Sequence, residues 1–96
     1  MLVLSLLDGE PMHGYRCVQE LQKRAKGLLQ FREGTIYPLL YTLRDRGLVR
    51  VSEIDDGSSR MRKVYEITDA GKKELLRQRQ SWADLVSATN IILDTQ

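Results

Sequence analysis

The last third of the chain constrains the fold most, because it is predicted to form one helix that the rest of the chain cannot cover. This helix spans residues 68–93, with Thr68 as its cap and Asp69 favourably placed in its first turn. Its apolar residues recur at intervals of seven and form one stripe, made of Leu75, Trp82, Leu85, Val86, Ile92 and Leu93. Such a helix is about 39 Å long, whereas only 67 residues precede it. We therefore expect the stripe to pack against a second copy of the chain across a two-fold axis.

Three shorter helices are predicted before this one. The first covers residues 2–7, an apolar run that ends at a turn. The second covers residues 13–26, and its apolar face consists of Cys17, Val18, Leu21 and Ala25. The third begins near residues 33–35 and ends at Gly47, and its predicted buried stripe consists of Ile36, Leu39, Leu40 and Leu43.

A β-hairpin is predicted between the third helix and the last one. Two segments rich in β-branched residues, 48–55 and 61–67, flank a Gly/Ser turn. Tyr65 and Ile67 share one face of the second segment, and this face can pack inward. The tip and the returning strand carry Ser59, Arg60, Arg62 and Lys63. Such cations are usual at a soluble hairpin end, but beside a basic helix they are also typical of a wing that contacts phosphate.

The positive charge of the chain is concentrated in one block. The net charge is only +2, but residues 13–50 contain eight basic and three acidic residues, which gives +5. Residues 68–96 contain four of each sign. A concentrated positive field is expected where phosphates are neutralised, although a solvated basic surface would give the same count.

The third predicted helix carries an unusual outer face. Tyr37, Tyr41 and Arg44 stand at i, i+4 and i+7, away from the apolar stripe. Tyrosine gains little from contact with water, so this face suits contact with a charged, hydrogen-bonding surface. The alternative is that the two rings cover a neighbouring element.

The composition disfavours several classes of function. The single Cys17 excludes an intrachain disulfide and is expected to be a packed core thiol, which favours a cytoplasmic protein. Cys17 and the single His13 offer too few groups for a metal site or a Cys–His nucleophile, so we expect no catalytic residue, metal or cofactor. The apolar run at residues 2–7 is too short for a signal peptide or a membrane span.

The order of the predicted elements is that of a winged helix-turn-helix domain followed by a dimerisation helix. The predicted fold class is therefore mainly α with a small β-hairpin (α+β). Residues 1–67 would form the winged helix-turn-helix domain, and residues 68–96 the C-terminal dimerisation helix. In this arrangement the third helix enters the major groove of DNA, and the wing touches the backbone or the minor groove.

The sequence also resembles the PadR family of bacterial transcriptional regulators. The resemblance is carried by GEPMHGY at 9–15, EGTIYPLL at 33–40, GLV at 47–49 and RKVYEITDAG at 62–71. The single C-terminal helix is similar to that of the smaller subfamily. The resemblance implies a cytoplasmic, homodimeric repressor that binds a palindromic operator and releases it when a small molecule binds.

Site residues are implied by the same resemblance. Thr35 and Tyr37 match positions at which the recognition helix of the family meets DNA, and the four hairpin residues named above match its wing. Trp82 matches a tryptophan that stacks on flat aromatic ligands at the dimer interface of multidrug-sensing members; packing between two helices is the alternative. Two other functions stay open: a winged helix that binds a protein, and a ligand-binding dimer without specific DNA binding.

Overall fold

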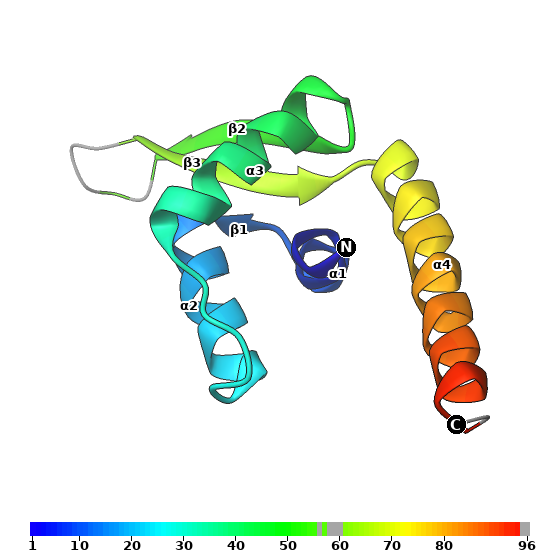
Figure 1. The fold of residues 1–96 in the computed structure, drawn as a ribbon. Helices are drawn as coiled ribbons and strands as arrows, with labels where there is room; N and C mark the ends of the chain where they lie inside the picture. Colours follow the sequence, from blue (N-terminus) through cyan, green and yellow to red (C-terminus); the bar gives the residue numbers. More distant parts are fainter. Residues whose placement is uncertain (56, 58–60, 95–96) are drawn as a thin grey trace.

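The computed structural model describes residues 1–55, 57 and 61–94. In chain order, the elements of this part are α1 (Leu2–Gly9), β1 (Met12–His13), α2 (Gly14–Ala25), α3 (Glu33–Asp45), β2 (Val49–Asp55), β3 (Met61–Ile67) and α4 (Asp69–Asp94). The first three helices and the sheet form one body, from which α4 extends (Figure 1). The predicted order of helices and hairpin, and the predicted α+β class, are confirmed.

The sheet contains one strand more than predicted. Its order is β1-β3-β2 with both pairs antiparallel, and Met12 and His13 of β1 lie opposite Tyr65 and Val64 of β3. A strand of two residues is too short to produce a periodic pattern, so the sequence predicts only a turn at this point. The predicted hairpin is therefore the larger part of a three-stranded sheet.

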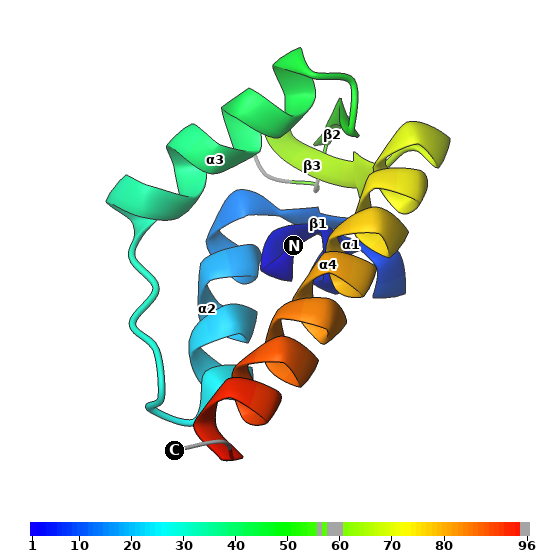
Figure 2. The same cartoon turned by 45° about the vertical axis from the view of Figure 1, so that its right-hand side comes forward.

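The core lies between one face of this sheet and the helices. Its largest fully buried side chains are Tyr65, Leu4, Leu7, Leu40, Val3 and Cys17. Helix α3 buries Ile36, Leu40 and Leu43 as predicted, but Leu39 is 40% exposed. The prediction for Leu39 is wrong: α3 lies across a small body (Figure 2), and this body covers Ile36, Leu40 and Leu43 but leaves Leu39 exposed.

Helix α4 is attached to the body only through its first turns. The Thr68 hydroxyl accepts the N–H of Gly71 at 3.0 Å, as expected of a cap, and donates to the carbonyl of Gly47 at 2.7 Å. Gly71 and Leu75 are buried, and α4 packs on α1 and β3 there. Farther along, every described residue from Arg79 to Asp94 is exposed in the single chain. The largest dimension of the molecule is accordingly 61 Å, against 29 and 20 Å in the other directions.

The prediction that Cys17 is a core thiol is confirmed, because its side chain is fully buried. Burial raises the pKa of the thiol from 9.0 to about 11. At pH 8 the reactive thiolate is therefore about 100-fold scarcer than in an exposed cysteine. We expect 5,5′-dithiobis(2-nitrobenzoate) to label the native protein at least about 100-fold more slowly than the protein unfolded in guanidinium chloride. Equal rates in the two states would contradict this placement of the thiol.

Candidate nucleic-acid interface

The exposed flank of α3 brings together three predicted residues. The rings of Tyr37 and Tyr41 have centroids 6.4 Å apart, tilted by 46°. The Arg44 guanidinium lies over the Tyr41 ring, 5.3 Å from its centroid, and also pairs with Asp45 at 3.1 Å. Aromatic pairs and cation–π contacts at these separations are attractive. The flank is therefore an ordered arrangement of two rings and one cation.

Tyr37 differs from the prediction that both rings face outward. It is half-buried and packs against the core, whereas Tyr41 is 41% exposed. Burial raises the pKa of the Tyr37 phenol, and the nearby Glu33 carboxylate raises it further. Of the two rings, Tyr41 thus offers more surface to a partner, while Tyr37 lies between the outer flank and the body.

Thr35 is exposed in the first turn of α3. Its backbone N–H donates to the carbonyl of Arg32 at 3.0 Å. Since successive residues of an α-helix are rotated by about 100°, Thr35 lies about 200° around the helix from Tyr37. Thr35 and Tyr37 therefore lie on nearly opposite sides of α3, and the structure does not bring Thr35 together with Tyr37, Tyr41 and Arg44.

The predicted wing residues are described in part. Arg62 and Lys63 are exposed on β3, whereas Ser59 and Arg60 lie outside the described residues. Nη1 of Arg62 lies 3.3 Å from Nε2 of His13, so the second strand of the hairpin touches β1 at the residue that caps α2. Sequence reasoning missed this contact, because the two residues are 49 positions apart.

The surroundings of His13 favour its neutral form. Burial lowers the pKa of the imidazole, and the charges of Arg62 and Arg16 lower it further. Its Nδ1 accepts the backbone N–H of Arg16 at 3.2 Å and so caps α2. His13 therefore acts as the cap of α2.

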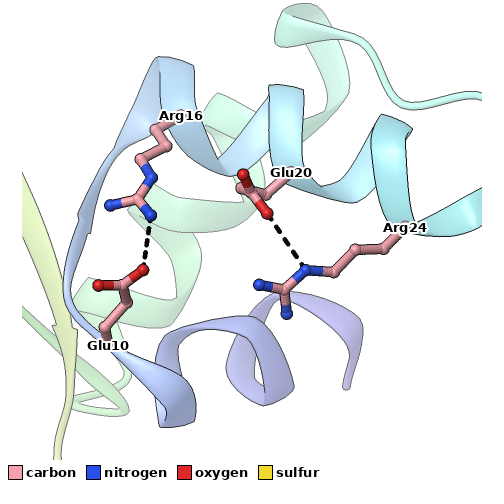
Figure 3. Close-up of polar contacts among 4 residues, drawn as sticks. All are labelled: Glu10, Arg16, Glu20 and Arg24. Carbon is pink, nitrogen blue, oxygen red and sulfur yellow. Dashed lines mark hydrogen bonds and ion pairs between the residues drawn. The ribbon is translucent and has the colours of Figure 1, made fainter.

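The basic block contains ion pairs that a charge count does not reveal. Arg16 pairs with Glu10 at 2.6 Å, and Arg24 pairs with Glu20 at 3.2 Å (Figure 3). Arg50 likewise pairs with Glu66 across β2 and β3. Exposed ion pairs of this kind add little stability. Glu10 and Glu66 lie outside residues 13–50, so their pairs with Arg16 and Arg50 do reduce the positive field relative to the predicted +5, a sum that already includes Glu20.

The predicted dimer stripe on α4 divides into two parts. Leu75 is 3% exposed and packs in the core of its own chain, so its burial needs no partner. The other five residues are exposed in the single chain: Trp82, Leu85, Val86, Ile92 and Leu93. Leu76 and Ile91, which the heptad spacing did not select, are exposed as well.

An apolar hollow of about 260 Å³ lies beside α2. It is lined by Leu2, Leu21, Arg24, Ala25, Leu28, Leu29 and Phe31. Trp82, the predicted effector-binding residue, does not line it. The hollow and the tryptophan are therefore separate features of the chain.

The described residues offer neither a cluster of metal ligands nor a membrane-spanning helix. No cluster of three or more His, Cys, Asp or Glu side chains within residues 1–55, 57 and 61–94 could hold a metal ion. Across the same part of the chain, no helix combines the length and apolar character needed to cross a bilayer.

Helix α3 with its exposed flank, the three-stranded sheet with its hairpin and the preceding helix α2 define a winged helix-turn-helix protein. The chain belongs to the PadR-like family of transcriptional regulators, whose family model matches residues 3–77. The family consists of regulators rather than enzymes, as expected from the composition. A search of curated proteins found no significant match.

Solved structures of the same fold support this membership. A PadR family transcriptional regulator from Eggerthella lenta is 31% identical, with a TM-score of 0.85 over 99% of this chain and 83% of the other. A PadR-like regulator from Bacillus cereus is also 31% identical, with a TM-score of 0.80 over 95% and 86% of the two chains. Bacillus subtilis PadR, solved in complex with operator DNA, is 27% identical, with a TM-score of 0.74 over 80% of this chain and 42% of the other.

Proposed function

We propose that this transcriptional regulator is a cytoplasmic homodimeric repressor that binds a palindromic operator and releases it on binding a small aromatic effector. The observation that carries the DNA-binding part is the ordered flank of α3, where Tyr41 and Arg44 are exposed beside each other. The complex of Bacillus subtilis PadR with operator DNA supports the same reading. Residues 1–67 would bind DNA, and residues 68–96 would hold the dimer together.

The proposed contacts follow from side-chain chemistry. Thr35, Tyr37 and Tyr41 approach base edges in the major groove, where hydroxyl groups can donate or accept hydrogen bonds. Cationic side chains of α3 and of the wing, together with the hydroxyl of Ser59, contact backbone phosphates; the cations are Arg44, Arg60, Arg62 and Lys63. Phosphate contacts supply affinity that depends on salt, whereas the base contacts supply specificity.

The proposed dimer is formed by the exposed apolar side of α4. Trp82, Leu85, Val86, Ile92 and Leu93 would be covered by the same residues of a second copy. Two-fold symmetry would place two copies of α3 on the two halves of a palindrome. Trp82 would additionally stack on the effector at this interface.

The test is a fluorescence-anisotropy titration with the promoter DNA of the gene itself and with a scrambled duplex, at two salt concentrations. We expect tighter binding to the promoter, weakened by salt. Equal or absent binding to both duplexes would favour a protein-binding winged helix. Quenching of Trp82 fluorescence by flat aromatic compounds, without specific DNA binding, would favour a ligand-binding dimer.

Replacing Lys63 by Ala should weaken binding to both duplexes and reduce the salt dependence. If Lys63 neutralises one phosphate, the slope of log K against log salt concentration should fall by about 1. The control is Lys73→Ala, which removes the same charge from an exposed position of α4. An unchanged slope for Lys63→Ala would remove this residue from the proposed phosphate contacts.

A further inference from the structure

Gly14 and Tyr37 pack against each other where the start of α2 meets α3. Gly14 is the first residue of α2 and is buried. A Cβ atom added to Gly14 would lie 2.5 Å from Cε1, 2.9 Å from Cζ and 3.0 Å from the hydroxyl oxygen of Tyr37. Carbon atoms in van der Waals contact are about 3.5 to 4 Å apart. Any side chain at position 14 would therefore displace the Tyr37 ring.

The backbone of Gly14 gives no other reason for glycine. The positive φ angles of the described glycines belong to Gly27, Gly47 and Gly57, so Gly14 has a conformation that other residues also adopt. In a helix, alanine is preferred to glycine. Space for the Tyr37 ring is thus the feature of this structure that requires glycine at position 14.

The Tyr37 ring is the first member of a series along α3. It lies 6.4 Å from the Tyr41 ring, and Tyr41 lies beneath the Arg44 guanidinium at 5.3 Å. Each of these pairs is close enough for a direct ring contact. A shift of the Tyr37 ring would therefore change the support of Tyr41 and, through it, of Arg44.

We propose that Gly14 is a positioning residue for DNA recognition: by leaving room for the Tyr37 ring, it fixes the Tyr37–Tyr41–Arg44 series against the operator. The proposal rests on the proposed DNA-binding function and adds a residue of α2 to the recognition machinery. Because the displaced atoms would be the end of a side chain and not backbone, Gly14→Ala should fold while its recognition flank is disturbed.

The experiment is a double-mutant cycle on promoter DNA, with Gly14→Ala, Tyr37→Leu and the combined variant. Gly14→Ala should bind about tenfold more weakly than the unmodified protein, since one ordered base or phosphate contact is worth about this much. In the Tyr37→Leu background the ring is absent, so adding Gly14→Ala should change the affinity less than about twofold. The matched control is Gly9→Ala at the end of α1, where an added Cβ meets no atom within 4 Å.

A second readout follows the ring itself. In Gly14→Ala the displaced phenol should become more exposed, so the pKa of Tyr37, now raised by burial, should fall toward its ordinary value in an NMR titration. If Gly14 had only a structural role, Gly14→Ala would lower the melting temperature without changing the pKa of Tyr37.

Several outcomes would overturn the proposal. Wild-type affinity of Gly14→Ala would show that the flank tolerates a side chain at position 14. An equal loss in both backgrounds would mean that Gly14 acts by a route other than Tyr37. If Gly14→Ala does not fold, the Tyr37→Leu variant tests the proposal alone. Unchanged promoter affinity of Tyr37→Leu would show that the Tyr37 ring takes no part in DNA recognition. If the unmodified protein shows no preference for its promoter, the proposed function itself fails and this inference fails with it.

Discussion

Gly71→Ala should destabilise the protein by about 3 kcal/mol, since overpacking against a fixed group has costs of this size. An added Cβ would lie 2.1 Å from the carbonyl oxygen of Leu48 and 2.7 Å from Cγ1 of Ile67. The carbonyl cannot move aside easily, because it accepts the N–H of Thr68 at 3.1 Å and belongs to a buried residue. The clash between the new Cβ atom and the Leu48 carbonyl could be relieved only if α4 moved away from the body. This movement would disrupt the packing around Leu75.

The measurement is thermal unfolding at one fixed protein concentration, because a dimer would make the melting temperature depend on concentration. For a chain of this size, a loss of about 3 kcal/mol corresponds to a decrease of roughly 12 to 24 °C. The matched control is Gly34→Ala in α3, where the added Cβ meets no atom within 4 Å. Alanine is the better helix former, so the control should melt at the same temperature or higher. A Gly71→Ala variant as stable as the unmodified protein would show that α4 is not fixed at this contact.

The role of Gly71 could not be predicted from the sequence. From the sequence it is a weak start to a helix, because glycine has a low helix propensity. The structure shows that it allows α4 to approach the Leu48 carbonyl closely. This approach depends on tertiary packing between residues far apart in the chain, and no local pattern contains it.

The helical elements could be predicted because their apolar periodicity is local. The same periodicity could not say what covers each apolar residue. Leu39 fits the i, i+3 spacing of the α3 stripe but is exposed, and Leu75 fits the heptad spacing of α4 but is buried in its own chain. The spacing of apolar residues predicts which side of a helix faces the core. How many of these residues are buried depends on the size of the body against which the helix packs.

The candidate site was predicted in part for a related reason. The series Tyr37, Tyr41 and Arg44 follows from helical spacing, and the structure brings these three together. The contacts of Tyr37 with Gly14 and of Arg62 with His13 join residues 23 and 49 positions apart. Since they depend on how α2 packs against α3 and on how β1 pairs with β3, neither spacing nor composition could show them.

Val86→Asp should convert the proposed dimer into a monomer at about 10 μM protein. Val86 lies in the middle of the exposed apolar stripe, between Trp82 and the Ile92–Leu93 pair, and is 39% exposed in the single chain. In a two-fold dimer, each copy would bury one unpaired carboxylate. An uncompensated buried charge costs about 3 to 5 kcal/mol, so the dissociation constant of the dimer should rise at least about 100-fold.

Sedimentation velocity over a series of protein concentrations measures this dissociation directly, and circular dichroism checks that the chain still folds. The matched control is Ser87→Asp, which adds the same carboxylate about 100° around the helix, outside the apolar stripe. We expect the control to sediment as the unmodified protein does. We also expect Val86→Asp to lose affinity for a palindromic operator, because only a dimer can bind both half-sites at once. Its affinity for a single half-site should be unchanged. A Val86→Asp variant that stays dimeric at low micromolar concentration would place the interface elsewhere on the chain, and α4 would then need another partner for its exposed apolar side.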